Sequence, residues 1–340
     1  MINAAIIVDK DYSKNKIFDD YLNKNVFDGR LFKYIALKRE LLNYGIDLVT
    51  HDMCDHSKTD IYIYLDSINR VKTNSHVKKF LIIIEPPSVY LKNHKKSIEN
   101  SYDKIFTWDD DIIDNSKYFK YNFSFDLNSL KKNYQNIRRS KLSVMICRNK
   151  VSRHKNELYS KREEVIRWYE KNMPSNFDLY GRGWDELKIK TYPFTFFNRY
   201  NLFGKFMNNI FQDKLNVYKG QIKSKSQVLS NYKFSYTYEN IEGINGYITE
   251  KIFDSFFSLT IPIYRGAKNI KKYIPEEIFI DSNNFDSVED ISNYIQSFDN
   301  SKLKSTQNDI IDFFSSEKAK VFCSKFNAEL IAKHIYESVK

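Results

Sequence analysis

Short runs of apolar residues recur along this chain and alternate with stretches long enough to form helices. The runs are AAIIVD, IDLVTHD, DIYIYLD, KKFLIIIEPP and YDKIFTWDD in the first half, and LSVMIC, FDLYG, KFSYTYEN and TIPIYRG in the second. Alternation of strand-length runs with helical stretches favours parallel sheets covered by helices. The sequence therefore predicts an α/β fold.

A polar and basic connector, KKNYQNIRRSK, interrupts this pattern near Arg139. Because a chain of 340 residues exceeds the usual size of one domain, we place a domain boundary there. The predicted units are an α/β domain at 1–138, a second α/β domain at 139–307, and a C-terminal tail at 308–340. The apolar spacing of the tail is helical, so the tail could pack back across both domains.

The formal net charge of +11 suits an anionic partner. We do not expect nucleic acid to be that partner, because the chain carries no nucleic-acid-binding motif. The odd number of three cysteines suits a reducing compartment. The apolar part of MINAAIIVDKDY is too short for a signal peptide, and no run approaches the length of a spanning helix. We expect a cytoplasmic protein and leave open a peripheral contact with a membrane surface.

The segment YENIEGINGYITEKIFDSFF combines a strand end, a loop with two glycines and a helix. Thr249 is a suitable N-cap, because its hydroxyl can accept a hydrogen bond from an unpaired backbone N–H of the first turn. Glu250 and Lys251 follow it directly. A second strand, TIPIYRG, completes a unit that favours a right-handed parallel crossover, and ligands of such sheets bind where the strands end.

The longer segment YKFSYTYENIEGINGYITEKIFDSFFSLTIPIYRGAKNIKKYIPEEIFID resembles the donor-binding motif of glycosyltransferase family 10, the α-1,3/1,4-fucosyltransferases. Weaker resemblance to bacterial members extends through IIIEPPSVYLKN, FDLYGRGW and YDKIFTWDDDIID. The resemblance implies a GT-B fold, in which two Rossmann-like domains face a cleft. It also implies an inverting mechanism, GDP-fucose as donor, and an oligosaccharide or glycolipid as acceptor, with no cofactor or metal required.

The same resemblance assigns the donor-binding residues. Glu250 would hold the ribose diol, since a carboxylate can accept from two hydroxyls, and Lys251 would meet the diphosphate as a point charge. In isolation, such a pair in a first helical turn is as often simply solvated. The further donor-site positions implied by the resemblance are Asn240, Tyr247, Arg162 and Lys225.

Arg162, in YSKREEVIRWYEK, is expected to pair with the donor phosphates. Arg148, Arg153 and Lys155 are neighbouring alternatives for that role. Lys225 is a secondary candidate. Arg162 could instead be a surface charge without a partner.

Inversion at the anomeric carbon needs a base for the acceptor hydroxyl, and Glu85 falls where the family places its catalytic carboxylate. Burial beside the apolar run that precedes it could raise its pKa toward a useful value. The alternative is a strand-end glutamate that binds a neighbouring backbone group. Pro86 and Pro87 follow, whereas many family members have a glycine-containing context here.

Two other clusters suggest metals. Asp109 and Asp111 have the D-x-D spacing that metal-dependent sugar transferases use, but capping of a helical turn is the favoured interpretation. His51, Cys54 and His56 offer zinc ligands without a fourth. We predict no metal site at either cluster.

Two regions depart from the family pattern. The aromatic and basic insertion at 191–220 suits packing, sugar stacking or a membrane interface. Arg265 stands where related sequences often carry an aromatic residue. The predicted function is transfer of fucose, most simply with α-1,3 linkage, to a surface glycan or glycolipid. The alternatives are transfer of another nucleotide-linked sugar, or a carbohydrate- or nucleic-acid-binding protein without catalysis.

Overall fold

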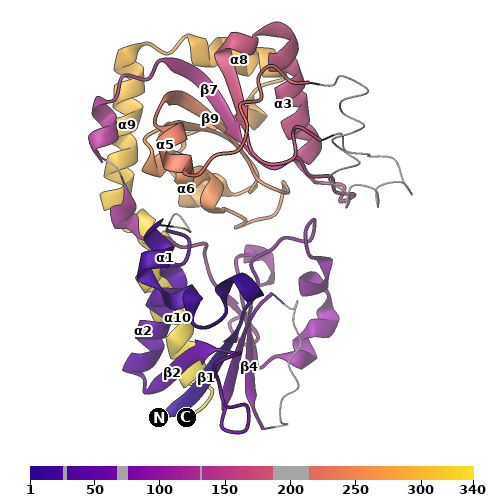
Figure 1. Ribbon diagram of the computed structural model, residues 1–340, viewed down its shortest axis with the longest axis vertical. Coiled ribbons are helices and arrows are strands. Elements are labelled where there is room, and N and C mark those ends of the chain that lie inside the picture. The colour runs from indigo at the N-terminus through magenta and orange to yellow at the C-terminus, as the bar shows by residue number, and fades with distance from the viewer. Residues whose placement is uncertain (26–28, 67–75, 131, 187–213) are drawn as a thin grey trace.

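Two parallel β-sheets, each covered by helices, form the two halves of the molecule (Figure 1). The computed structural model describes residues 1–25, 29–66, 76–130, 132–186 and 214–340. Of the insertion predicted at 191–220, residues 191–213 lie outside the described residues. All strand pairs below are parallel.

The first sheet has six strands in the order β2-β1-β3-β4-β5-β6. Its strands are β1 Ile2–Ile7, β2 Ile46–Thr50, β3 Ile61–Leu65, β4 Lys78–Ile82, β5 Lys104–Thr107 and β6 Tyr118–Lys120. The helices α1 Asp20–Asn25 and α2 Phe32–Asn43 belong to the same half. The short strand β6 is absent from the sequence-based prediction.

Side chains of the first sheet alternate between two apolar layers, as the period of a strand requires. Ile6, Ile63 and Phe80 belong to the layer that includes α2, whereas Ile7 and Leu81 belong to the opposite layer. Both faces are buried, which explains why these strands read as continuous apolar runs.

The second sheet has five strands in the order β11-β10-β9-β7-β8. Its strands are β7 Lys141–Ile146, β8 Phe177–Tyr180, β9 Tyr232–Tyr238, β10 Ile261–Arg265 and β11 Ile280–Asp281. The helices of this half are α3 Tyr159–Asn172, α5 Lys225–Leu229, α6 Glu250–Phe257, α7 Ile270–Tyr273 and α8 Val288–Gln296. The predicted unit of strand, glycine loop, helix and strand is confirmed as β9, α6 and β10, with β9 and β10 paired in parallel.

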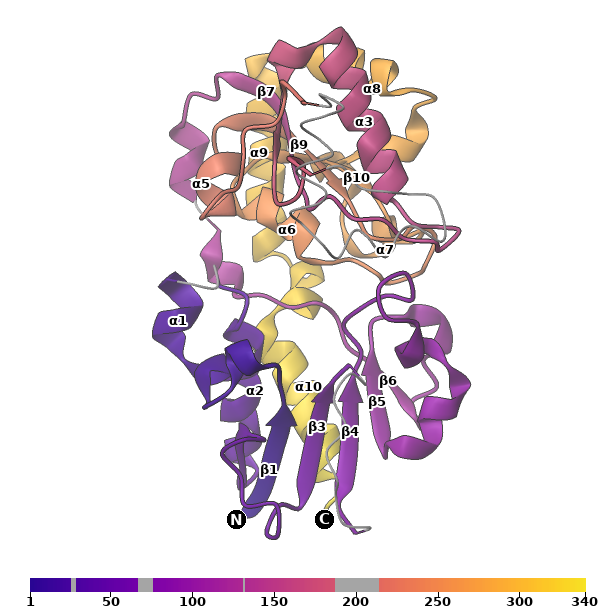
Figure 2. The ribbon, with the colours of Figure 1, turned by 45° about the vertical axis from the view of Figure 1, so that its right-hand side comes forward.

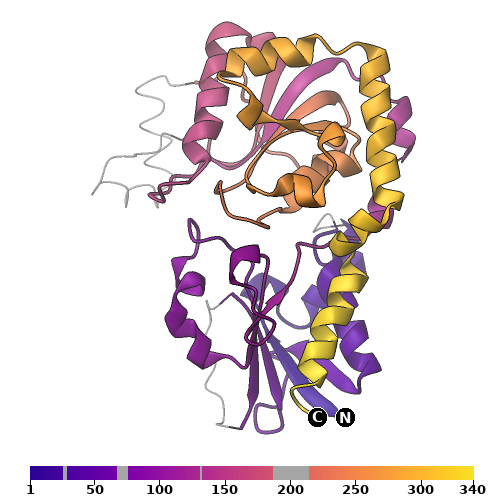
Figure 3. The same cartoon turned by 180° about the vertical axis from the view of Figure 1, so that it is seen from behind.

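The last two helices run along one side of both halves (Figures 1 and 3). α9, Asn300–Ser315, places Ile310 in the apolar cluster that surrounds α6. α10, Ser324–Tyr336, returns to the first sheet, where Ile331 and Ile335 pack in the layer of α2 (Figure 2). The helical character of the tail is therefore confirmed. The boundary at 138/139 stays a prediction, as does the one at 307/308, which falls inside α9.

Among the helices of the described ranges, none combines the length and the apolar character that crossing a bilayer requires.

The two halves meet at Asp110, which follows β5. Its carboxylate accepts hydrogen bonds from Lys120 Nζ at 2.6 Å in its own half. From the second half, Tyr273 Oη and Asn269 Nδ2 donate to it at 2.7 Å each. We call these four residues the interdomain clasp. Burial alone would raise the pKa of Asp110, but the hydrogen bonds from Lys120 and Tyr273 outweigh it and lower the pKa.

The clasp leads to a prediction about stability. Asp110→Asn keeps the size of the side chain but leaves the partly buried ammonium of Lys120 without its counter-charge. We expect the free energy of unfolding to fall by about 1.5–3 kcal/mol, the usual worth of a hydrogen bond to a charged group. Urea unfolding measures this change, with Asp286→Asn, an exposed aspartate, as the control for loss of one negative charge.

The pH dependence provides a second measurement of the same variant. Because the pKa of Asp110 is lowered on folding, its stabilising contribution is complete above the ordinary carboxylate pKa and is lost as the pH falls through the lowered value. The difference between the parent and Asp110→Asn should therefore shrink on acidification. A constant difference down to low pH would show that the charge of Asp110 is not what stabilises this junction.

Candidate functional site

A cavity of about 420 Å³ lies between the two halves. Residues at the carboxyl ends of β7 and β9 line it on one side, and Glu85, which follows β4, lines it on the other together with Arg30. Ligands of parallel α/β sheets bind at such strand ends. The predicted site residues that line the cavity are Glu85, Arg162, Lys225, Asn240, Glu250 and Lys251.

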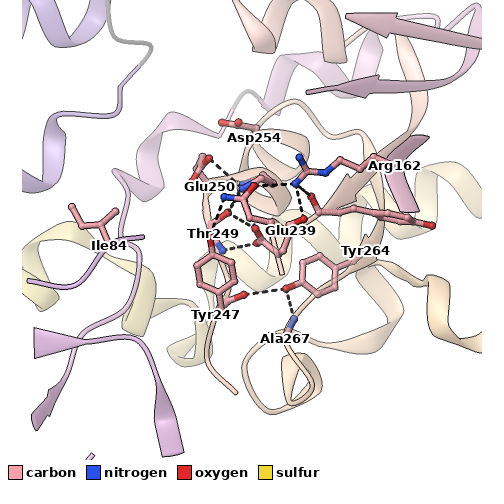
Figure 4. Close-up of polar contacts among 12 residues, drawn as sticks. Ile84, Arg162, Glu239, Tyr247, Thr249, Glu250, Asp254, Tyr264 and Ala267 are labelled. Carbon is pink, nitrogen blue, oxygen red and sulfur yellow. Dashed lines mark hydrogen bonds and ion pairs between the residues drawn. The ribbon is translucent and has the colours of Figure 1, made fainter. Parts of the chain in front are cut away.

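The start of α6 is built around a buried acid, Glu239, which follows β9 directly (Figure 4). Its carboxylate accepts from the backbone N–H and the hydroxyl of Thr249, both at 2.8 Å, and from Lys251 Nζ at 3.0 Å. The side chain of Glu239 is 0% exposed, so burial raises its pKa, and the charge of Lys251 opposes that shift. Three donors thus fix the first turn of α6 on the end of β9.

Thr249 also acts as the N-cap predicted from the sequence, since its hydroxyl accepts from the backbone N–H of Lys251. Glu250 follows, with its carboxylate 3.6 Å from Lys251 Nζ. Burial alone would raise the pKa of Glu250, but the charges of Lys251 and Lys225 outweigh it and lower the pKa to about 2. Glu250 therefore carries a full negative charge at neutral pH, as an acceptor of hydroxyl hydrogen bonds should.

Arg162, from α3, is 4% exposed and holds the end of β9 in place. Its Nη2 donates to the carbonyl oxygens of Tyr238 at 2.7 Å and Glu239 at 2.6 Å, and to Asn240 Oδ1 at 3.1 Å. Figure 4 shows the guanidinium directed at this strand end. In this structure the arginine positions the loop that carries the acids, and its contact with phosphates stays a prediction.

Lys225, at the start of α5, forms an ion pair with Asp254 of α6. Burial alone would lower the pKa of Lys225, but the carboxylates of Asp254 and Glu250 outweigh it and raise the pKa. Both members of the pair line the cavity. The pair fastens α5 to α6.

Tyr247 lies near the predicted site but does not line the cavity. It is 2% exposed, and its ring packs on Trp108 of the first half with 4.5 Å between ring centroids. Its hydroxyl accepts from Asn240 Nδ2 at 3.4 Å. Tyr247 thus belongs to the contact between the halves, and its predicted contact with a nucleotide sugar is untested.

The loop between β9 and α6 approaches the first half closely at Gly246. This glycine has a φ of +82°, and a Cβ there would stand 2.2 Å from the carbonyl oxygen of Trp108. Any side chain would therefore push the halves apart. On the other side of the loop, Arg265 Nε donates to Glu242 at 2.6 Å, so the residue that departs from the family pattern fixes the loop.

Glu85 faces this machinery from the first half. Its backbone N–H donates to Asp66 Oδ1 at 3.1 Å, and its carbonyl oxygen accepts from His94 Nε2 at 2.9 Å. Within the described residues, its carboxylate forms no hydrogen bond or ion pair. It therefore does not bind a neighbouring backbone group of the described chain, as the alternative interpretation of a strand-end glutamate would require. Burial and, next, the charge of Asp66 raise the pKa of Glu85.

The two metal alternatives have structural explanations. Asp109 caps the 3-10 helix Asp110–Ile112, and Asp111 accepts from Asn245 Nδ2 at 2.8 Å. In the other cluster, Cys54 Sγ and His56 Nδ1 are 3.5 Å apart, and the same histidine nitrogen is 2.6 Å from Tyr62 Oη. Over the described ranges, no three histidine, cysteine, aspartate or glutamate side chains are grouped so that they could hold a metal ion.

Three residues of this site were not identified from the sequence: Glu239, Asp66 and Trp108. Glu239 stands at a strand end just before a glycine loop, which is a signal for a buried anchor. Asp66 directly follows β3, but its contact is with Glu85, 19 residues later in the chain, and a sequence pattern does not show such a contact. Trp108, whose Nε1 donates to the carbonyl oxygen of Ile84 at 3.2 Å, gives no sequence signal beyond its size.

Comparison with curated proteins identifies two relatives. The chain is 41% identical over 85 residues to an alpha-(1,3)-fucosyltransferase, FucT, of Helicobacter pylori, a match that spans 24% of this chain and 18% of that enzyme. It is 29% identical over 106 residues to an alpha-(1,4)-fucosyltransferase of Arabidopsis thaliana, spanning 28% of this chain and 26% of the relative. Each match thus spans about a quarter of the relative or less.

Solved structures match almost the whole chain. A crystal structure of an alpha1,3-fucosyltransferase with GDP-fucose covers 98% of this chain and 90% of its own, with a TM-score of 0.55 and 17% identity. Anabaena HepE, solved with UDP and glucose, covers 99% of this chain and 100% of its own, with a TM-score of 0.58 and 8% identity. At these identities the likeness shows the fold alone, and the predicted GT-B fold is confirmed.

The sequence model of glycosyltransferase family 10 (fucosyltransferase), C-terminal part, matches residues 138–308. This range contains the second sheet and the whole motif that carries the family resemblance. The matched range is more than half of the chain. The protein therefore belongs to glycosyltransferase family 10.

Proposed function

We propose that this protein is an inverting α-1,3-fucosyltransferase that moves fucose from GDP-fucose to a hydroxyl of a surface glycan or glycolipid. One observation carries the proposal. Glu85, whose carboxylate forms no hydrogen bond or ion pair with the described residues, shares a cavity with Glu250 and Lys251 of the family motif and reaches it from the opposite half. Inversion needs this arrangement, with a base on one side of the anomeric carbon and the leaving group on the other.

In the proposed reaction the acceptor hydroxyl oxygen attacks the anomeric carbon of fucose while Glu85 takes the hydroxyl proton. The bond between the anomeric carbon and the phosphate oxygen breaks, and GDP leaves with the electron pair. The raised pKa of Glu85 suits this role, because a general base works best when its pKa approaches the working pH.

The donor is proposed to lie against the second half. Glu250 accepts from the ribose hydroxyls, and its full ionisation at neutral pH makes it a strong acceptor. Lys251, at the positively polarised N-terminus of α6, faces the diphosphate. The cytoplasmic location, the peripheral membrane contact and the absence of a nucleic-acid partner stay predictions.

The direct test is incubation of the protein with GDP-fucose and a panel of oligosaccharide acceptors. We expect a fucosylated product and stoichiometric release of GDP, and we expect GDP-fucose to raise the melting temperature. Stabilisation and transfer with another nucleotide sugar instead would assign a different donor. Binding of a glycan without consumption of any nucleotide sugar would show a protein without catalysis.

The base assignment predicts the effect of Glu85→Gln, which keeps the shape of the side chain but removes the proton acceptor. Transfer should fall by about 10²-fold or more, while GDP affinity changes little. Steady-state rates and calorimetric GDP titration measure the two effects. Glu277→Gln, an exposed glutamate of the second half, is the matched control. A folded Glu85→Gln protein with nearly parental turnover at saturating substrates would exclude Glu85 as the base.

A further prediction concerns metal dependence. Because cations of the protein are proposed to offset the diphosphate charge, and Asp109 and Asp111 are engaged as a helix cap and in a contact with Asn245, transfer should persist in EDTA. The rate is measured before and after exhaustive chelation. Complete loss of transfer, with recovery on adding Mg²⁺ or Mn²⁺, would contradict this assignment.

A further inference from the structure

The loop that follows β7 brings two more cations to the cavity. Arg148 and Lys150 both line it. Within the described part of the chain, neither side chain forms a hydrogen bond or an ion pair. From the sequence, Arg148 is one of several alternatives to Arg162 as a phosphate ligand, and Lys150 is not a candidate.

By contrast, the cations predicted from the family resemblance already have hydrogen-bond or ion-pair partners in the protein. Lys251 donates to the buried Glu239 at 3.0 Å, and Lys225 is paired with Asp254. Arg162 is engaged with backbone and amide oxygens at the end of β9. Arg30, which also lines the cavity, has an interaction partner as well. Much of the positive charge of the motif is therefore already offset by the protein.

The loop that carries Arg148 and Lys150 is held at several points. Between them, Asn149 donates from its backbone N–H to the carbonyl oxygen of Arg182 at 3.0 Å and from Nδ2 to that of Gly183 at 2.9 Å. Farther along, Ser152 Oγ donates to the carbonyl oxygen of Ser88 in the first half at 3.0 Å. The two cations thus stand on a fixed segment.

Charged residues of both halves of the molecule influence the pKa of Lys150. Burial lowers its pKa, the charge of Glu85 opposes this shift, and the charges of Arg148, Lys251 and Arg162 add to it. Several cations therefore lie close enough together in this cavity for their charges to act on Lys150. Such proximity is unfavourable unless an anion occupies the space between the cations.

We propose that Arg148 and Lys150 bind the diphosphate of the nucleotide-sugar donor, with Lys150 at the phosphate that leaves. The inference rests on the proposed function and deepens it. Negative charge grows on the phosphate oxygen as its bond to the anomeric carbon breaks. A cation already in place there stabilises the transition state more than the bound donor. Lys150 should therefore act mainly on kcat, and Arg148 on donor affinity.

The test compares Arg148→Ala and Lys150→Ala with Lys155→Ala, which removes an exposed positive charge from the same loop outside the cavity. GDP, GMP and guanosine are titrated by calorimetry, and kcat and KM are measured for donor and acceptor. We expect each cavity variant to lose about ten-fold or more in GDP affinity, and Lys150→Ala to lose about as much or more in kcat. Guanosine affinity should not change, and Lys155→Ala should match the parent. Lys150→Arg should restore part of the rate.

The pH profile gives an independent measurement. The charged groups that act on Glu85 are Asp66 and Glu250, which raise its pKa, and Lys150 and Lys251, which lower it. Removing Lys150 should therefore shift the acidic limb of the transfer rate to higher pH, whereas Lys155→Ala should leave it in place.

The outcomes separate the inference from the proposed function. If the parent transfers fucose but both cavity variants behave like Lys155→Ala, the inference alone is wrong. Equal losses for guanosine and GDP would show a structural role and also overturn it. A rise in acceptor KM alone would assign the cations to an acidic group of the acceptor instead. If no nucleoside diphosphate stabilises the parent, both the proposed function and the inference fail.

Discussion

A fully buried carboxylate is the constraint on which this site depends. Glu239 has no contact with solvent, and a buried charge is tolerated only when it is paired and fully hydrogen-bonded. Thr249 and Lys251 provide that pairing, and in doing so they place the first turn of α6 at the end of β9. Arg162 secures the same strand end from α3. The position of Glu250 in the cavity follows from these contacts.

The loop between β9 and α6 also joins the two halves. Gly246 permits a close backbone approach to Trp108, and Tyr247 packs its ring on the same tryptophan. Because the indole N–H of Trp108 donates to the carbonyl oxygen of Ile84, this residue connects the motif to the strand end that carries Glu85. The proposed base and the proposed donor site are therefore held by one continuous set of contacts, and the interdomain clasp lies beside it.

Much of this architecture could be predicted from local sequence. Periodicity and capping act over a few residues. They are enough to predict the strands β9 and β10, the start of α6 at Thr249 and the helical tail. The engagement of Lys251 by Glu239 could not, since a motif gives residue types and not their partners. Asp66 and Trp108 act through contacts with residues distant in sequence. The burial of Tyr247 depends on how the halves meet, which periodicity does not encode.

The return of α10 to the first sheet determines the order in which this protein can fold. Ile331 and Ile335 complete the apolar layer of α2, so the core of the first half includes residues that are made after the whole second half. During translation, that half therefore has an apolar sheet face that α2 but not yet α10 covers while the second half is made. Such a face favours aggregation. We therefore expect the first half to need protection during translation, although its strands are made first.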